Sequence, residues 1–336
     1  MKKIIFAVFI SCVFVFASCE QKQSTTIVPG DVVNDSTEVE EPQVPDTISA
    51  NDIVIKRELQ YTKYLVGDVY PYKDTTREFQ LDKMKEKLAL LENIQREPVS
   101  WAILQNYKNK NREAPLVRNY HRNSYTRIAD SLDVERYQSV PMYELSDSTQ
   151  AIIYGRDGWL VKYLGDEGSF KKVEAMERNG EWLIPQRYVK HIHDSVVFNK
   201  AIFVDVTNQN IATFEKDSSV WKLRSMNPAT TGVHRPPYAQ ETPLGMFVIQ
   251  EKKAKMLFLK DGSTALGGFA PWASRFSNGG YIHGVPTNVP ATEIIEYSYS
   301  LGTTPRSHMC VRNASSHAKF IYDWITPEEA VLFVID

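Results

Sequence analysis

The sequence predicts a mainly β protein with some α-helix, ending in a β-sandwich over residues 200–336. Two observations support this fold class. Apolar and polar residues alternate with the period of a half-buried strand after residue 200, and turn residues recur at regular intervals between residues 129 and 193. A helical apolar repeat precedes them, within residues 52–128. The length after the N-terminal segment suffices for two or three domains.

Residues 1–18 have the composition of a removable signal. Two lysines near the start are followed by an almost purely apolar stretch that is too short to span a bilayer comfortably. Because Cys19 follows Ser18 directly, the segment resembles a bacterial lipoprotein signal, although Phe16 stands where leucine is usual. The resemblance implies lipidation of Cys19 and a membrane anchor in the cell envelope. The absence of Asp directly after Cys19 is compatible with the outer membrane, facing the periplasm, which is the expected location. Plain secretion, with a spare cysteine, is the alternative.

Residues 19–51 are predicted to be a disordered tether. They are rich in Ser, Thr, Val, Pro and acidic residues, and they show no aromatic residue and no apolar period. Such a segment cannot bury enough apolar surface to offset the entropy of folding.

One amphipathic helix is predicted within the partly helical region, residues 52–128. Asp74, Thr75 and Thr76 offer N-caps, and Pro98 forbids continuation. The apolar residues between them recur at three and four positions, at Leu81, Met84, Leu88 and Leu91. The aromatic residues that follow are predicted to form a satellite core rather than a glycan-binding face; they are Trp101, Tyr107, Tyr120 and Tyr125.

Residues 129–193 are predicted to form a small barrel of short strands separated by turns such as Asp157-Gly158 and Asn179-Gly180. The strand-like runs are Ser139 to Tyr143, Ala151 to Tyr154, Trp159 to Tyr163, Lys172 to Met176 and Trp182 to Ile184. The stretch from Tyr154 to Val161, followed by Trp182-Leu183-Ile184-Pro185, resembles a bacterial SH3-like module. Such a module either binds cell-wall peptide or braces the neighbouring domain.

Residues 200–336 are predicted to be strands with one helix near the end. The strands are Ala201 to Val206, Ile211 to Phe214, Gly245 to Gln250, Met256 to Leu259 and Val331 to Ile335. A helix from Ser316 to about Trp324 is predicted to lie on the sheet, and Pro327 would end it.

Cys310 is the only thiol expected to remain after secretion. Of the three cysteines, Cys12 lies in the leader and Cys19 at its end, so no partner is left for an intrachain disulfide. Cys310 is then either a nucleophile activated by His283 or His308, or a small buried apolar residue. Two histidines and an arginine in one C-terminal stretch favour the nucleophile, so the sequence predicts an enzyme.

Four sequence blocks, in one order, carry a family resemblance. They are Ile202-Phe203-Val204-Asp205, Thr242-Pro243-Leu244-Gly245-Met246-Phe247, Gly280-Tyr281-Ile282-His283-Gly284 and Ser307-His308-Met309-Cys310-Val311-Arg312. Together they resemble the catalytic domain of YkuD-like L,D-transpeptidases over roughly residues 200–336. The resemblance implies a transferase of peptidoglycan biosynthesis, active in cell-wall biogenesis and cell shape. It would crosslink the third residues of two stem peptides through a thioester on a cysteine.

The resemblance assigns the chemistry to two side chains. Cys310 would be the nucleophile, and His283 would be the base, oriented by a backbone carbonyl near Gly284. The tetrahedral oxyanion needs pre-aimed donors, for which the backbone N–H groups of Met309 and Cys310 are the candidates.

The remaining residues of the last block are given supporting roles. His308 and Met309 would support the pocket, and Ser307 and Arg312 are predicted to contact substrate. A guanidinium suits a substrate carboxylate, but an internal ion pair is an equal alternative for Arg312.

Two departures from the family pattern bear on activity. Met309 stands where glycine is usual, and its side chain could crowd the pocket or exclude a positive φ. The 23 residues between His283 and Ser307 are also more than the family usually has. Residues 285–306, with a helix near Thr292 to Tyr299, are therefore predicted to form an inserted lid or wall over the cleft.

Several classes of site are not expected. A formal net charge of −2 gives no basic field for nucleic acid, and no glycine-rich phosphate loop indicates a nucleotide. His234 is predicted to be a surface histidine. The other histidines show no metal spacing, so neither metal nor cofactor is predicted; they include His121, His191, His193 and His317.

Alternative functions stay open at this point. With water as acceptor the same chemistry gives an L,D-carboxypeptidase, and with a protein amine it gives a protein-to-wall ligase. An alternative from another class is a wall-binding lipoprotein whose SH3-like module carries the function and whose Met309 marks a disabled catalytic domain.

Overall fold

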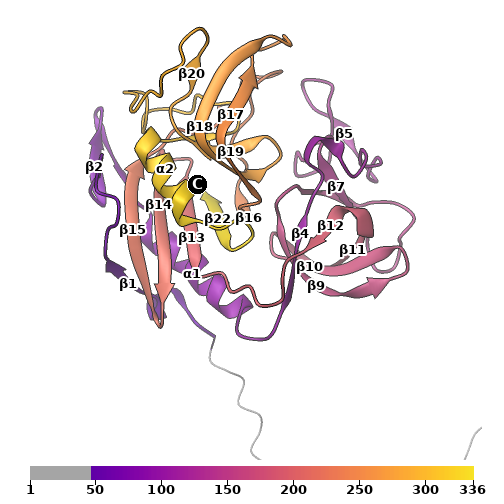
Figure 1. Ribbon diagram of the computed structural model, residues 1–336. Helices are drawn as coiled ribbons and strands as arrows, with labels where there is room; N and C mark the ends of the chain where they lie inside the picture. The colour runs from indigo at the N-terminus through magenta and orange to yellow at the C-terminus, as the bar shows by residue number, and fades with distance from the viewer. Residues whose placement is uncertain (1–46) are drawn as a thin grey trace, which may run out of the picture. The chain divides into compact units, whose positions relative to one another are not determined.

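Strands dominate residues 47–336, which are the residues that the computed structural model describes (Figure 1). The mainly β class predicted from the sequence is confirmed. The predicted signal, the lipidation site Cys19 and most of the predicted tether lie outside the described residues. Within residues 47–336, no helix combines the length and the apolar character needed to cross a bilayer.

A six-stranded mixed sheet forms the base of the C-terminal part, in the order β1-β15-β14-β13-β22-β16. β1 runs parallel to β15 and β13 parallel to β22, whereas the other neighbours are antiparallel. The strands are β1 (Val54–Arg57), β13 (Lys200–Asp205), β14 (Asn210–Asp217), β15 (Val220–Pro228), β16 (Gly245–Val248) and β22 (Ala330–Ile335). Because β1 precedes all the others by a long stretch, the N-terminal region supplies an edge strand of this sheet.

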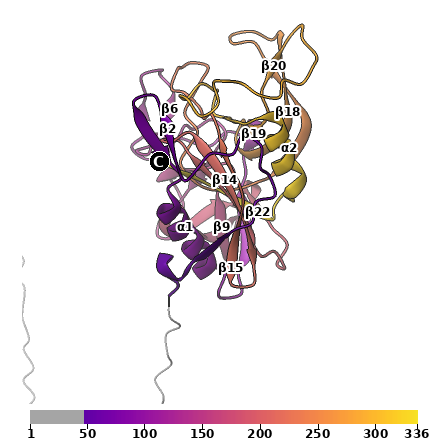
Figure 2. The ribbon, with the colours of Figure 1, turned by 90° about the vertical axis from the view of Figure 1, so that its left-hand side faces the viewer.

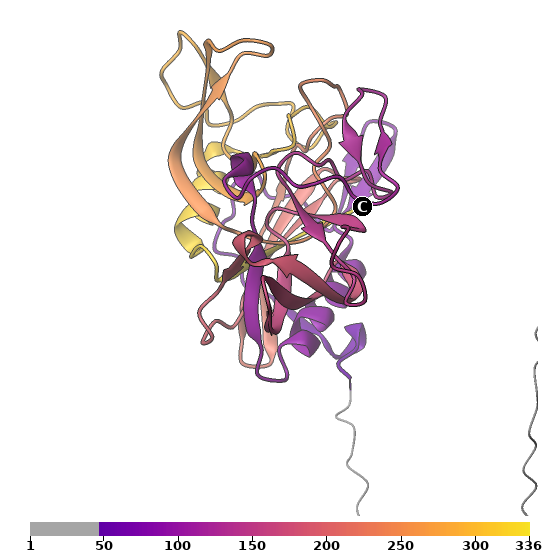
Figure 3. The ribbon, with the colours of Figure 1, turned by 90° about the vertical axis from the view of Figure 1, so that its right-hand side faces the viewer.

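A second sheet has the order β17-β18-β19-β21, with β20 paired to β18. Its strands are β17 (Glu251–Leu259), β18 (Leu266–Ser277), β19 (Gly280–His283), β20 (Thr287–Asn288) and β21 (Val311–Arg312). The β17–β18 hairpin extends beyond the rest of this sheet (Figure 3). We call residues 251–277 the flap.

The first sheet is buried on both faces, which explains why its strands are nearly all apolar. Phe203 packs on one face against α1 (Leu81–Ile94), while its neighbour Ile202 packs on the other face with the second sheet and α2 (Ser315–Trp324). Figure 2 shows α1 and α2 on either side of the sheet. Each large apolar side chain buried in this way contributes about 1.5–3 kcal/mol. The predicted sandwich is therefore present, with one helix on each side.

Residues 100–191 form a strand module, which combines the end of the predicted partly helical region with the predicted SH3-like module and is centred on a five-stranded antiparallel sheet (Figure 3). Its order is β11-β10-β9-β4-β12, and two short hairpins, β5–β6 and β7–β8, accompany it. The strands are β4 (Ser100–Leu104), β5 (His121–Arg122), β6 (Ile128–Ala129), β7 (Ser139–Met142), β8 (Ile153–Arg156), β9 (Leu160–Glu167), β10 (Phe170–Ala175), β11 (Arg178–Pro185) and β12 (Val189–His191). β4 belongs to the region predicted to be partly helical, and the SH3-like character of the module stays a prediction.

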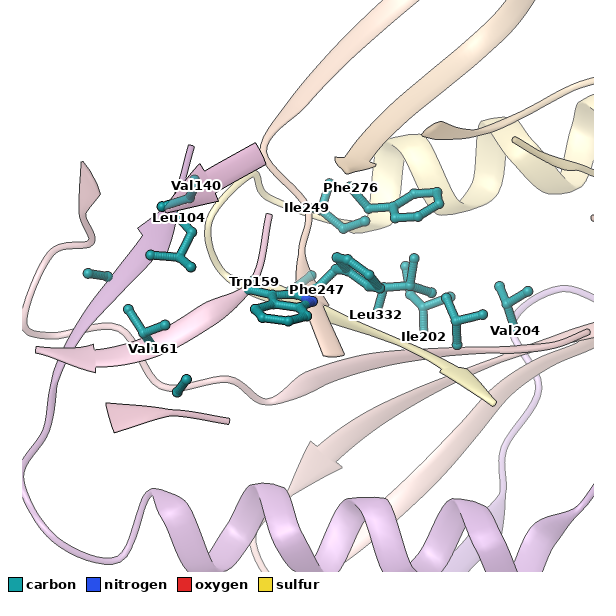
Figure 4. Close-up of a cluster of buried hydrophobic side chains, with 14 of the residues drawn as sticks. Leu104, Val140, Trp159, Val161, Ile202, Val204, Phe247, Ile249, Phe276 and Leu332 are labelled. Atoms are coloured by element: carbon teal, nitrogen blue, oxygen red, sulfur yellow. The ribbon is translucent and has the colours of Figure 1, made fainter. Parts of the chain in front are cut away.

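The strand module and the sandwich share one hydrophobic core (Figure 4). The backbones of Trp159 and Phe247, which lies in β16, pair as an isolated antiparallel β-bridge, and both side chains are buried. Gly158, at φ +94°, approaches β18 so closely that an added Cβ would lie 1.9 Å from the Phe276 carbonyl oxygen. Only glycine fits there without moving the backbone.

The start of the described region corrects one detail of the predicted helix. The helix is present, but the expected N-caps at residues 74–76 lie in the hairpin of β2 (Val69–Tyr72) and β3 (Thr75–Glu78), and α1 begins only after Gln80. Short 3-10 turns occupy Ala50–Asp52, Tyr107–Asn109 and Gln186–Tyr188. Residues 47–51 were predicted to belong to the tether, and within them Ile48 exchanges two hydrogen bonds with Asn93 of α1, at 3.0 and 2.7 Å.

The prediction of a helix near residues 292–299 is wrong, because residues 285–306 contain β20, bends, turns and irregular segments but no helix. Tertiary hydrogen bonds decide the conformation. The Glu296 carboxylate accepts a hydrogen bond from the backbone N–H of Ser316 at 3.1 Å, and the Glu296 backbone carbonyl accepts one from the N–H of Ser315 at 2.8 Å. The segment therefore caps the first turn of α2. An extended path brings these acceptors to the helix end, and it overrides a weak helical propensity.

Candidate active site

Strands β19 and β21 place four chemically active side chains on one face of the second sheet. They run parallel, with Ile282 opposite Val311. Since side chains alternate along a strand, these two residues point into the core, where both are buried. Their sequence neighbours point the other way and line a cavity of about 740 Å³; they are Tyr281, His283, Cys310 and Arg312.

The Cys310 thiol is nearly enclosed, with 9% of the residue exposed. Its Sγ–H points at the Gly279 carbonyl oxygen, 3.5 Å away, in the turn between β18 and β19. Burial raises the pKa of the thiol, opposed by a backbone hydrogen bond at Tyr281 and by the charge of Arg312. The resting form at neutral pH is therefore the thiol, and an attack by sulfur requires a base.

His283 has the protonation state and tautomer of such a base. Its Nδ1 lies 2.6 Å from the Gly284 carbonyl oxygen, which can only accept, so Nδ1 carries the proton and Nε2 has a free lone pair. Burial lowers the pKa of His283 to about 4, so the ring is neutral at pH 7. His283 and Cys310 line the same cavity, as an acid–base pair requires.

The turn before Cys310 is held in an unusual backbone conformation. Met309 has φ +113°, in a region that side chains rarely adopt, at a typical cost of about 1–3 kcal/mol. Met309 thus adopts the positive φ that glycine would take more easily. Its side chain is buried and is not part of the cavity wall, so it leaves the cavity open.

Three contacts maintain this turn. The Ser307 hydroxyl donates to the Cys310 carbonyl, and the Thr242 hydroxyl donates to the Met309 carbonyl at 2.7 Å while accepting the Gly232 N–H at 2.8 Å. Gly232 is needed because a Cβ there would lie 2.8 Å from the Met309 Cα. The Thr-Pro-Leu-Gly block therefore has a function that its sequence does not reveal, which is to fix the turn before Cys310.

Two further predicted residues line the cavity in different environments. His308 is exposed, and its Nε2 lies 2.9 Å from a carboxylate oxygen of Asp261 at the flap tip. Arg312 forms no ion pair within residues 47–336, and its Nε is buried without a hydrogen-bond partner. The internal ion pair considered for Arg312 is therefore not found in the described part of the chain.

The sequence did not reveal one wall of the cavity. Tyr107 and Lys108 of the strand module line it, together with flap residues from Lys253 to Leu259. Tyr107 was predicted to belong to a satellite core, but its hydroxyl lies 3.4 Å from that of Tyr281 and its ring stacks under Arg275 at 4.4 Å. No local motif marks Tyr107, because the contact arises only when the strand module meets the flap.

A second cavity, of about 680 Å³, lies between the β5–β6 region and residues 234–243. Its polar groups are largely partnered, since Arg127 forms an ion pair with Glu135 at 3.0 Å and the His234 Nδ1 lies 2.6 Å from a carboxylate oxygen of Glu241. Half of the His234 side chain is exposed, in line with the surface position predicted for it.

We expect the free energy of unfolding to fall as the pH drops from about 6.5 to 4. Burial lowers the pKa of His283 to about 4 and that of His317 to about 3. The unfolded chain binds these protons near pH 6.5 and the folded chain only at lower pH, so acid favours unfolding. Urea denaturation at pH 7, 5.5 and 4.5 measures the slope. His317→Gln should reduce it, whereas a variant of the exposed His234 should not; equal slopes in both variants would contradict this assignment.

Comparisons with known proteins agree with this geometry. Residues 199–332 match the family model described as the YkuD L,D-transpeptidase catalytic domain. A comparison with the curated proteins gave no match.

Solved structures with similarity to the chain include three of low identity. A fused Zn-dependent amidase/peptidase/peptidoglycan-binding domain protein from Clostridium acetobutylicum ATCC 824 is 20% identical, with 41% of this chain and 52% of that chain covered and a TM-score of 0.30. This chain thus spans about half of that protein. The L,D-transpeptidase LdtMt1 in complex with imipenem is 17% identical, with 58% of this chain and 99% of that chain covered and a TM-score of 0.35. An L,D-transpeptidase from Mycobacterium tuberculosis H37Rv is 16% identical, with 54% of this chain and 92% of that chain covered and a TM-score of 0.33.

The match of the family model spans β19 with His283, Cys310 with the strand β21 that follows it, and the Thr242 block that fixes the turn before Cys310. Residues 199–332 of this chain form a YkuD-type L,D-transpeptidase catalytic domain.

Proposed function

We propose that the protein is a cysteine-dependent L,D-transpeptidase acting on peptidoglycan stem peptides. The observation that carries the proposal is the pairing of β19 with β21, which puts Cys310 and a neutral His283 in the wall of one cavity. The family match supports the substrate class.

In the proposed first step, the Cys310 sulfur attacks the carbonyl carbon of the third stem residue. His283 Nε2 takes the thiol proton as the C–S bond forms, and passes it to the nitrogen of the departing D-alanine as the amide bond breaks. The product is a thioester. An acceptor amine then attacks it, His283 removes the amine proton, and the thiol is regenerated with a new amide bond.

Developing negative charge on the carbonyl oxygen needs donors aimed at it. The turn and loop hydrogen bonds of residues 47–336 assign no acceptor to the backbone N–H groups of Met309 and Cys310. The positive φ of Met309 supports their role as oxyanion donors, because it sets the orientation of these successive peptide units.

Arg312 is suited to a substrate carboxylate. Its guanidinium lines the cavity beside Cys310, and its buried Nε lacks a partner among the described residues. An unpaired buried charge is costly, and a carboxylate of the peptide would satisfy it with charge-assisted hydrogen bonds.

Location in the cell envelope, through a lipid on Cys19, is part of the proposal and rests on the sequence of the N-terminal segment. A tether of some thirty residues would let the catalytic domain reach the wall, at up to ~3.3 Å per residue.

The acceptor is tested by incubating the protein with purified cell wall and analysing muropeptides by mass spectrometry. Transpeptidation predicts dimers joined between third residues. Tripeptide monomers would instead indicate an L,D-carboxypeptidase, and a protein-linked muropeptide a protein-to-wall ligase. Unchanged muropeptides, with wall binding retained, would favour the catalytically disabled wall-binding lipoprotein.

A further inference from the structure

The cavity around Cys310 is lined by cations from two separate parts of the chain. Lys108 belongs to the strand module, and Lys253 and Lys255 belong to β17 of the flap. With Arg312 these residues give four cationic side chains against one carboxylate, Asp261, which is already paired with His308. The whole chain has a formal net charge of −2, so the excess of cations is local to this cavity.

Aromatic rings hold these lysines in place without neutralising them. The Lys108 Nζ lies 5.4 Å from the centroid of Tyr107, and the Lys255 Nζ lies 4.0 Å from that of Phe269. Neither lysine forms an ion pair within residues 47–336. A cation over a ring face keeps its full charge, so it stays available to an anion.

Lys253 differs from the other two lysines because it has a carboxylate partner. Its Nζ lies 3.1 Å from Glu251, but that carboxylate is shared with Arg275, also at 3.1 Å, and with the Tyr281 hydroxyl at 2.7 Å. Because Arg275 also pairs with Asp157, at 2.7 Å, the two cations face two carboxylates, and the unpaired charges of this cavity wall are those of Lys108 and Lys255.

The segment that carries Lys108 is rigidly fixed to the cavity wall. The backbone N–H of Tyr107 donates to the buried Asp157 at 3.1 Å, and that of Lys108 donates to Gln138 at 2.8 Å. Lys108 itself has φ +54°, so the turn is defined by these contacts rather than by backbone preference. The strand module is thus a structural part of the cavity.

We propose that Lys108, Lys253 and Lys255 form a carboxylate-binding subsite that makes the enzyme prefer stem peptides with free carboxylates over amidated ones. The inference rests on the proposed function for its substrate class. The unpaired charges of Lys108, on the strand module, and Lys255, on the flap, with Lys253 beside them, attract an anionic peptide and orient it, and amidation would remove the charge that they recognise.

Binding to the full chain carrying Cys310→Ala tests the subsite without turnover. Calorimetry would compare a stem tetrapeptide whose carboxylates are free with the same peptide amidated on its side carboxylates. We expect the free acid to bind about tenfold more tightly at low salt, and less so as salt screens the contacts. Lys108→Glu combined with Lys255→Glu should remove the preference.

Lys110→Glu and Lys260→Glu are matched controls, because these lysines lie close in sequence but do not line the cavity. They should leave the preference unchanged. Equal binding of the two peptides, no binding of either, or the same loss in controls and test variants would overturn the subsite. Thioester formation by the wild-type chain separates the two proposals. Turnover without a preference leaves the function standing, whereas a preference without turnover leaves only the subsite.

Discussion

Replacing Cys310 with alanine is expected to abolish acyl transfer and leave the fold intact. The sulfur is the only thiol within residues 47–336, and no other side chain of the cavity could form the thioester. Loss of a nucleophile that acts with its base typically costs ~10⁴-fold or more in rate. The release of D-alanine from a stem tetrapeptide measures the rate, and circular dichroism reports the fold.

Two histidines serve as matched comparisons for this result. His283→Ala should cost nearly as much as the loss of the sulfur, because the thiol would lose its proton acceptor. His308→Ala should cost less than about tenfold, since its exposed ring contacts Asp261 at the flap tip. A Cys310→Ala variant that releases D-alanine at the wild-type rate would rule out the cysteine mechanism.

Replacing Asp157 with alanine is expected to destabilise the protein by about 3–5 kcal/mol, because it removes the fully buried partner of the Arg275 cation and leaves three backbone N–H groups without their acceptor; the partly exposed Glu251 is then the one carboxylate that still pairs with Arg275 among the described residues. The Asp157 side chain is fully buried, the Arg275 side chain is 6% exposed, and their ion pair measures 2.7 Å. Asp157 also accepts the backbone N–H groups of Asn106 and Tyr107 at 2.9 and 3.1 Å and that of Asn278 at 2.9 Å. Urea denaturation measures the change.

Asp157→Asn should lower the stability by an intermediate amount, because an amide oxygen can still accept hydrogen bonds from some of these N–H groups. Asp166→Ala is the control: its carboxylate pairs with Lys171 at the surface, so its loss should leave the stability almost unchanged. If Asp157→Ala and Asp166→Ala behaved alike, the ion pair would not be the link between the strand module and the flap. Catalytic activity should fall together with stability. Asp157 holds the backbone of Asn278, and the carbonyl of the next residue, Gly279, accepts the hydrogen bond of the Cys310 thiol.

The sequence predicted five strands of the sandwich, from side-chain alternation after residue 200 and from the turns between strands, but it did not predict that the first sheet is buried on both faces. β13, β14, β16 and β22 were all expected close to where they lie. The longest strand, β18, was missed because Gly267, Gly268 and Pro271 are typical of loops. Pairing with β17 along its length stabilises it, and that pairing is not visible in a local window.

The candidate site was predicted in part. His283 and Cys310 stand out because a lone thiol and a histidine occur in ordered blocks, and the structure brings both to one cavity. Tyr107 and Lys108 could not be predicted, since their place depends on how Asp157 holds the strand module against the flap. Contacts between distant parts of the chain leave no periodic signal in either part.

In the proposed mechanism Cys310 carries the acyl group between donor and acceptor. Intact-mass and peptide mass spectrometry of the wild-type chain, quenched in acid during turnover of a stem tetrapeptide, tests it most directly. The proposed mechanism predicts that the protein gains the mass of the tetrapeptide minus that of the released D-alanine, with the adduct located in the peptide that contains residues 307–312 and absent from Cys310→Ala. Turnover without this adduct, or an adduct on another residue, would contradict the account.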